Sequence, residues 1–135
     1  MAQLAVTPYN GRMTEHELTN YLEQRLAERQ PRRIPQPDLA EAGVLVAITA
    51  EASPKLLLTL RASHLSSHQG EVAFPGGKRD PEDHDIIHTA LREAQEEVGL
   101  EPHQVQVLGV MDQVVSRFGY LVTPVLGIIR PGLDH

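Results

Sequence analysis

Cysteine is absent from the 135-residue sequence, and so is any long uninterrupted run of apolar residues. Without cysteine there are no disulfides, no thiolate nucleophile and no Cys-ligated zinc site. A membrane-spanning helix needs about 18 or more consecutive apolar residues, which the chain does not provide. The opening residues, MAQLAVTPYNGRM, also lack the charged region and apolar run of a secretory signal. We therefore expect a cytoplasmic protein with no membrane partner.

Aromatic residues make up only 4% of the chain, and its formal net charge is −6. A platform that stacks successive nucleic-acid bases needs aromatic side chains. Nonspecific binding to nucleic acids or anionic membranes needs a basic surface. The composition therefore favours a small-molecule substrate over nucleic acid. A phosphate-bearing ligand is still compatible with an acidic protein if metal ions or a local basic group neutralise its charge.

Prolines separate the first part of the sequence from the rest. Residues 14–30 have the apolar spacing of an amphipathic helix. The next segment, PRRIPQPD at residues 31–38, contains three prolines and is predicted to be a linker. We expect an N-terminal helix and linker over residues 1–37. Residues 38–135 are then expected to form a single domain, since the chain is long enough to bury a core.

The remaining hydrophobic segments predict strands on either side of a second helix. Residues 43–50 and 55–61 are candidate strands that can pair as a hairpin. Residues 104–115 and 120–130 are further candidates, separated by the turn sequence SRFG. The order helix, strands, helix, strands predicts an α+β fold, with a mixed sheet and helices packed against it.

The second helix is predicted to run from about Asp85 to Val98, and Gly99 is suited to end it. Its buried face should contain four residues at spacings of four, three and four, namely Ile87, Leu91, Ala94 and Val98.

Three glutamates, Glu93, Glu96 and Glu97, share another face of this helix, roughly opposite its apolar stripe. Like charges at this spacing repel each other, so a solvated surface, a basic partner or a cation should offset the repulsion. Carboxylates that converge from one rigid element suit Mg²⁺ or Mn²⁺, and Arg92 can hold a carboxylate in place. The plainer alternative is a solvated acidic face without a ligand, which is common in helices.

The sequence around these glutamates resembles the Nudix box, G-x5-E-x7-R-E-U-x-E-E-x-G-U, in which U is an aliphatic residue. The likeness spans residues 76–100, GGKRDPEDHDIIHTALREAQEEVGL. Ala94 stands at the first aliphatic position, a mild departure. The second half otherwise matches at Arg92, Glu93, Glu96, Glu97, Gly99 and Leu100.

The first half of the box departs further from the pattern. The five-residue spacer after Gly77 is followed by Asp83 in place of glutamate, and Asp83 is one residue further from Arg92 than the box prescribes. Three residues are candidates for the role of this first acid: Asp80, Glu82 and Asp83.

The preceding residues narrow the resemblance to the coenzyme A pyrophosphatase branch of this family. Residues 56–77, LLLTLRASHLSSHQGEVAFPGG, are similar to its signature L-L-T-x-R-S-x-x-L-x-x-H-x-G-x-V-x-F-P-G-G, with Ala62 in place of serine. Members of the branch usually continue for some tens of residues beyond the strand that ends here near Ile129. The resemblance therefore implies a Nudix-like α/β/α sandwich that is truncated at its C-terminus.

The function implied by this resemblance is hydrolysis of the pyrophosphate bond of coenzyme A or its derivatives, giving 3′,5′-ADP and 4′-phosphopantetheine. Mg²⁺ or Mn²⁺ would neutralise the polyanionic substrate and lower the pKa of a bound water. Glu96 and Glu97 would be metal ligands, and Glu93 would be a ligand or the general base. Gly76 would offer its carbonyl oxygen to the metal, and Arg92 would orient a carboxylate.

Four residues upstream of the box are implied to contact the substrate, namely Arg61, His68, Gly70 and Phe74. Plainer explanations exist for three of them. Arg61 can form a surface ion pair of little energetic value, and His68 can be a solvated residue. Phe74 can close its strand and aim the glycine loop that follows.

Several alternatives stay open. A Nudix hydrolase could instead act on ADP-ribose or NADH. A Nudix-like domain could bind a ligand or partner without catalysis. An ordinary domain with a solvated acidic helix would show no change in stability with Mg²⁺ or Mn²⁺. A short C-terminus would also leave the strand over residues 120–129 at a sheet edge, which would allow a homodimer.

Overall fold

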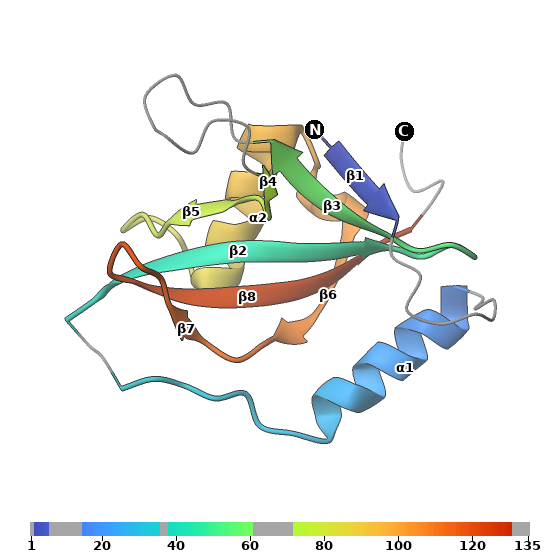
Figure 1. The fold of residues 1–135 in the computed structure, drawn as a ribbon, viewed down its shortest axis with the longest axis horizontal. Coiled ribbons are helices and arrows are strands. Elements are labelled where there is room, and N and C mark those ends of the chain that lie inside the picture. Colours follow the sequence, from blue (N-terminus) through green and yellow to red (C-terminus); the bar gives the residue numbers. More distant parts are fainter. Residues whose placement is uncertain (1, 6–14, 36–37, 61–71, 131–135) are drawn as a thin grey trace.

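The structure, a computed structural model, describes residues 2–5, 15–35, 38–60 and 72–130 (Figure 1). None of the helices in these ranges is long and apolar enough to cross a membrane. The elements in chain order are β1 (Ala2–Ala5), α1 (Glu15–Ala27), β2 (Ala40–Thr49), β3 (Lys55–Leu60), β4 (Val72–Ala73), β5 (Gly76–Lys78), α2 (Ile86–Val98), a 3-10 turn (Pro102–Gln104), β6 (Val105–Val110), β7 (Val114–Val115) and β8 (Tyr120–Ile129).

A mixed sheet forms the middle of the molecule, with strands in the order β1-β3-β2-β8-β6. β2 and β8 run parallel along their whole length, from Ala40 opposite Tyr120 to Thr49 opposite Ile129. β3 pairs antiparallel with β2, and β6 pairs antiparallel with β8. The predicted hairpin of β2 and β3 and the predicted mixed sheet are therefore confirmed. Because β8 lies between β2 and β6, the expectation that residues 120–129 lie at a sheet edge is wrong.

The two helices cover opposite faces of this sheet. Successive residues of a strand point to opposite faces. Leu45 and Ala47 belong to the buried cluster against which α2 packs, whereas Ile48 and Ala50 belong with Leu18 of α1. The molecule is therefore an α/β/α sandwich, as predicted.

Helix α2 begins and ends where the sequence predicts. The carboxylate of Asp85 caps its N-terminus by accepting a hydrogen bond from the backbone N–H of His88 at 2.8 Å. Gly99 ends the helix with a φ of 74°, in the left-handed region that glycine adopts without strain. These end signals are local, which is why the sequence alone locates them.

The buried face of α2 differs in part from the predicted stripe. Ala94 is buried, and the other predicted residues, Ile87, Leu91 and Val98, are partly buried against the core. Ala90, which the spacing argument omits, is 0% exposed. Helix α2 packs closely against β2 at this point. A Cβ added to Gly43 of β2 would lie only 2.9 Å from the carbonyl oxygen of Ile86 and 3.3 Å from the backbone nitrogen of Ala90.

Gly76–Lys78 form strand β5, whereas the sequence predicts a loop there. β5 pairs antiparallel with the start of β2, with Lys78 opposite Ala42 and Gly76 opposite Val44. A Cβ on Gly76 would lie 2.5 Å from the carbonyl oxygen of Gly43, so only glycine permits this approach. Pairing with β2, not side-chain propensity, makes this segment a strand.

The strand predicted over residues 104–115 is divided into β6 and β7. The intervening Asp112 and Gln113 bond to the linker that follows α1. The Asp112 carboxylate accepts from the backbone N–H of Arg32 at 2.7 Å, and the N–H of Gln113 donates to the Arg32 carbonyl at 2.9 Å. These contacts replace strand pairing and hold the linker against the sheet.

Candidate functional site

Arg92 lies at the centre of the charged cluster beside α2. Its Nε donates to Oδ1 of Asp83 and its Nη2 to Oδ2, both at 3.0 Å. The Asp83 side chain is only 2% exposed and that of Arg92 is 21% exposed. This two-point, charge-assisted contact joins the turn before α2 to the second turn of the helix.

Asp83 accepts two further hydrogen bonds. The backbone N–H of Asp80 donates to it at 2.9 Å and the Thr89 hydroxyl at 2.8 Å. The hydrogen bonds from Arg92 hold the pKa of the Asp83 carboxyl well below its usual range, against the opposing effect of burial. The same contact raises the pKa of Arg92. Both groups are therefore charged at neutral pH.

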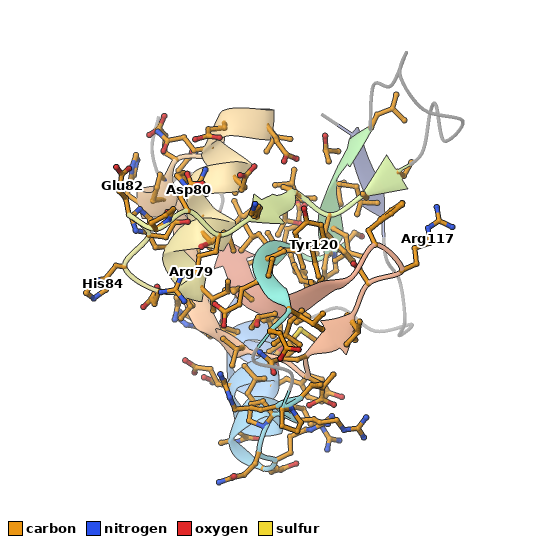
Figure 2. The ribbon with its side chains drawn as sticks, turned by 90° about the vertical axis from the view of Figure 1, so that its left-hand side faces the viewer. Arg79, Asp80, Glu82, His84, Arg117 and Tyr120 are labelled. Atoms are coloured by element: carbon orange, nitrogen blue, oxygen red, sulfur yellow. The ribbon has the colours of Figure 1, made fainter. Side chains whose placement is uncertain are left out.

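The structure distinguishes the three candidates for the first acid of the box. Asp83 is the buried partner of Arg92. Asp80 lies 3.5 Å from the guanidinium with its side chain 56% exposed, and Glu82 is exposed. Figure 2 shows Asp80 and Glu82 on the turn beside α2. The one residue by which the spacing from Asp83 to Arg92 exceeds that of the box lies between this turn and α2. Within the turn, the N–H of Asp83 donates to the Asp80 carbonyl at 3.0 Å.

Arg92 also contacts two of the three glutamates. Its Nη1 donates to Glu93 at 3.1 Å and to Glu96 at 3.3 Å, while Nη2 donates to the Lys78 carbonyl at 3.2 Å. Glu97, one turn after Glu93, is exposed. One guanidinium therefore ties the glutamate face of α2 to strand β5.

The Glu93 carboxylate lies against the backbone of Gly77. A Cβ on Gly77 would be 2.5 Å from Cδ of Glu93, so any larger residue there would have to displace this carboxylate. The Glu93 side chain is 18% exposed and that of Glu96 is 58% exposed. The predicted site residues Arg92, Glu93 and Glu96 are thus neighbours beside β5. Gly76, the residue before Gly77, packs against Gly43 and Val44 of β2.

Replacing Gly77 by alanine should displace the Glu93 carboxylate and lower the free energy of unfolding by about 0.5–1.5 kcal/mol, the cost of holding a flexible side chain off its preferred rotamer. Urea unfolding followed by far-UV circular dichroism measures this. Lys78→Ala, at the exposed next position of β5, is the control and should change stability by less than about 0.5 kcal/mol. Equal effects of the two substitutions would contradict the contact between Gly77 and Glu93.

The donor set fits a hard divalent cation in its chemistry. Arg92 lies within ion-pair distance of Asp80, Asp83, Glu93 and Glu96, so carboxylates outnumber the cation that neutralises them. Mg²⁺ and Mn²⁺ favour such oxygen ligands. Within the described ranges, no three acidic or histidine side chains are already gathered as metal ligands. Glu93 and Glu96 instead form ion pairs with Arg92.

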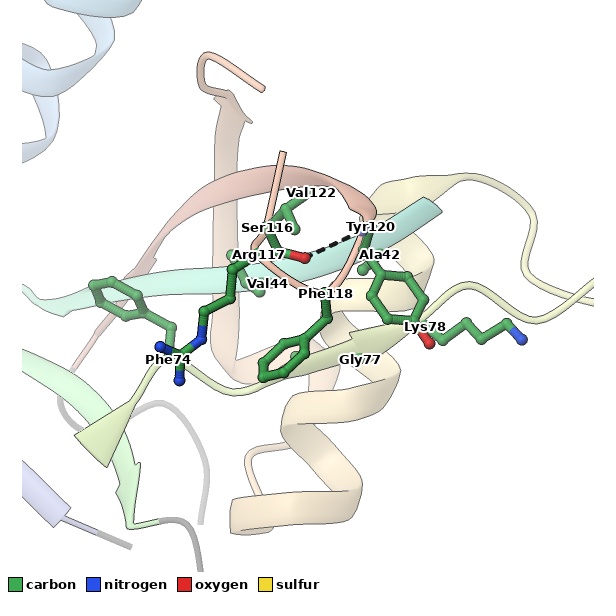
Figure 3. A pocket seen from close by; sticks show the side chains of 11 residues that line it. Ala42, Val44, Phe74, Gly77, Lys78, Ser116, Arg117, Phe118, Tyr120 and Val122 are labelled. Atoms are coloured by element: carbon green, nitrogen blue, oxygen red, sulfur yellow. Dashed lines mark hydrogen bonds between the residues drawn. The ribbon is translucent and has the colours of Figure 1, made fainter. Parts of the chain in front are cut away.

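A cavity of about 510 Å³ lies on the other side of β5 (Figure 3). Its floor includes Ala42 and Val44 of β2, which point away from α2 because Gly43 between them faces that helix. The other described lining residues are Phe74, Gly76, Gly77, Lys78, Ser116, Arg117, Phe118, Tyr120 and Val122. Gly76 and Gly77 therefore separate this cavity from the carboxylate cluster.

Of the residues predicted to contact substrate, Phe74 lines this cavity, while Arg61, His68 and Gly70 lie outside the described residues. Two further lining residues, Arg117 and Phe118, come from the turn between β7 and β8 and are not among the predicted substrate contacts. One signal was available. Phe118 is one of two phenylalanines in the chain and stands in a turn, where an apolar ring is not needed for folding.

Residues 39–131 match the family described as the NUDIX domain. The chain is 54% identical over 93 residues to the "Uncharacterized Nudix hydrolase NudL" of Photorhabdus laumondii subsp. laumondii, and 52% identical over 95 residues to the protein of the same name from Escherichia fergusonii. These alignments cover 69% and 70% of this chain but 50% of each relative. The chain therefore spans about half the length of these curated relatives.

A similar fold occurs in the crystal structure of a Nudix hydrolase from M. smegmatis, RenU. The two share a TM-score of 0.56 and 26% sequence identity, over 70% of this chain and 64% of that one. The predicted Nudix-like fold is confirmed by this likeness together with the mixed sheet and its two covering helices.

Proposed function

The chain belongs to the Nudix family, and we propose that it hydrolyses the pyrophosphate bond of coenzyme A or a derivative, giving 3′,5′-ADP and 4′-phosphopantetheine. The observation that carries this proposal is the gathering of Glu93 and Glu96 by Arg92 beside Gly76 and Gly77. The choice of coenzyme A rests on the signature that residues 56–77 resemble.

The proposed metal ligands are Glu93, Glu96, Glu97 and the carbonyl oxygen of Gly76. Mg²⁺ or Mn²⁺ held there would neutralise charge on the diphosphate and lower the pKa of bound water. Arg92, fixed by Asp83, would keep two carboxylates at the same edge of β5. The reaction adds water oxygen to one phosphorus, breaks the bridging P–O bond and releases two phosphate monoesters. Glu93 would accept the proton of the attacking water if it serves as the general base.

A second candidate is a Nudix domain that binds a ligand without hydrolysing it. One observation favours it: Arg92 already pairs with Glu93 and Glu96, two of the proposed metal ligands. A hydrolase for ADP-ribose or NADH would use the same carboxylates and differ only in the substrate it admits.

The first experiment is an assay of coenzyme A hydrolysis with Mg²⁺ or Mn²⁺, with products separated by chromatography and with ADP-ribose and NADH as competing substrates. The proposal predicts 3′,5′-ADP from the wild type and none from Glu97→Gln. Glu101→Gln, which changes an acid just beyond α2, is the matched control and should keep activity.

Thermal unfolding with and without metal gives an independent measurement of metal binding. Saturating Mg²⁺ should raise the unfolding midpoint of the wild type, because a ligand that binds only the folded state stabilises it. Glu97→Gln should lose most of this shift. Metal-dependent stabilisation without any hydrolysis would favour the binding domain, and hydrolysis of ADP-ribose alone would replace coenzyme A as the substrate.

A further inference from the structure

The cavity beside β5 has the size and the walls of a small-molecule site. Its volume of about 510 Å³ falls within the roughly 300–1,000 Å³ range of ligand pockets. The floor is aliphatic, from Ala42, Val44 and Val122, and aromatic rings stand at its walls. In Figure 3 the ring of Phe118 lies across the cavity in front of β5.

Phe118 is the most exposed large hydrophobic side chain of the described part of the chain, at 71%. It is carried by a well-bonded turn. The N–H of Ser116 donates to the Tyr120 carbonyl at 2.8 Å, the N–H of Gly119 to the Ser116 carbonyl at 3.0 Å, and the N–H of Tyr120 to the Ser116 hydroxyl at 3.1 Å. The fold therefore holds an apolar ring in solvent at the mouth of a cavity.

The charges around this ring suit an anion. Arg117 places its guanidinium carbon 5.2 Å from the centroid of the Phe118 ring, a cation–π contact. Lys78 stands at the other end of the cavity (Figure 3). Both charged residues among the described lining are thus basic, although the chain carries a net charge of −6. The carboxylates lie beyond Gly77, on the side of α2.

We propose that this cavity binds the nucleotide end of the substrate, with the purine base stacked on Phe118 and a phosphate group contacting Arg117. A planar base gains stacking energy on an exposed aromatic ring, and a phosphate matches the guanidinium fork. The pantetheine arm offers no ring for stacking. A substrate seated this way would extend past Gly76 and Gly77 toward Glu93. The inference rests on the proposed function only for the identity of the substrate.

Binding of the product nucleotide tests the inference without requiring hydrolysis. Isothermal titration calorimetry in the absence of metal compares 3′,5′-ADP with 4′-phosphopantetheine. Phe118→Ala should raise the Kd for 3′,5′-ADP about 5- to 150-fold, because stacking on an aromatic ring contributes about 1–3 kcal/mol per base. Phe118→Tyr keeps the ring and should stay within about 3-fold of the wild type. Val114→Ala, an exposed change outside the cavity lining, is the control for nonspecific effects.

A second pair of ligands tests the phosphate contact. Arg117→Gln should weaken 3′,5′-ADP binding about 10- to 150-fold, the loss expected for one charge-assisted hydrogen bond, and should leave adenosine binding nearly unchanged. Equal weakening of both ligands would overturn the assignment of Arg117 to phosphate.

The base-binding inference is overturned if Phe118→Ala binds 3′,5′-ADP as the wild type does, or if the wild type binds only 4′-phosphopantetheine. Both outcomes are distinct from failure of the proposed function. Phe118-dependent nucleotide binding with no hydrolysis of coenzyme A would support the site and reject the activity. Hydrolysis that is indifferent to Phe118→Ala, in KM as well as in kcat, would support the activity and reject the site.

Discussion

Glu93→Gln should lower kcat/KM for the diphosphate substrate by about 10²–10⁴-fold, the range found when a general base is lost. Glu93 is the glutamate held most closely at the edge of β5, by the Arg92 guanidinium on one side and the Gly77 backbone on the other. Glutamine keeps the shape of the side chain. It carries no charge for a metal ion and cannot accept a proton from water at neutral pH.

The measurement is steady-state hydrolysis across pH, beside metal titrations that record the unfolding midpoint. If Glu93 is a metal ligand, the variant should need more Mg²⁺ to reach the same stabilisation. If Glu93 is only the base, metal affinity should be kept and the acidic limb of the pH–rate profile should disappear. Glu101→Gln should behave as the wild type in both assays. A loss of less than 10-fold would remove Glu93 from the reaction.

The parts of the fold that the sequence predicts are those with local signals. Asp85 and Gly99 mark the ends of α2 because a capping carboxylate and a left-handed glycine act within one turn of the chain. β2 and β8 are recognisable because their apolar runs are long and rich in branched residues. Such features depend on few residues, so one sequence suffices.

The parts that the sequence does not predict depend on pairing between distant segments. β5 contains two glycines and has no strand propensity, yet its backbone pairs with Ala42–Val44. β1 is a strand because Ala2–Ala5 pairs with Lys55–Leu58. Ala90 is buried in the core because α2 packs closely against Gly43 of β2. In each case a partner far along the chain decides the outcome.

The candidate site shows the same division. The spacing of the box brings Arg92 and the glutamates to one face, but only the folded turn shows that Asp83 is the buried partner of Arg92. The turn that carries Phe118 precedes β8, and it lies beside the cavity because the start of β2 pairs with both β5 and β8. Ala42 pairs with Lys78 of β5 on one side and with Val122 of β8 on the other. No pattern in the sequence predicts that β5 and β8 both pair with the start of β2.

Asp83→Asn should lower the free energy of unfolding by about 2–4 kcal/mol at pH 7, since it removes one charge of a largely buried ion pair and leaves the other in place. The asparagine would also turn an N–H group toward donors, because Arg92, Thr89 and the Asp80 backbone all donate to this position. Urea unfolding followed by far-UV circular dichroism measures the loss. Asp80→Asn, at the more exposed and more distant neighbour, should cost less than about 0.5 kcal/mol.

The pH dependence of this difference identifies its cause. The pKa of Asp83 is lowered in the folded state, chiefly by its hydrogen bonds from Arg92. In the unfolded chain the carboxyl titrates near its ordinary value of about 3.9. Between these two pKa values the unfolded state binds more protons, so stability rises with pH there. The contribution of Asp83 is therefore complete above about pH 5 and is lost as the pH falls below about 4. Wild type and Asp83→Asn should converge in stability toward acidic pH, and a gap that stays constant from pH 7 to pH 3 would mean that packing, not charge, makes Asp83 important.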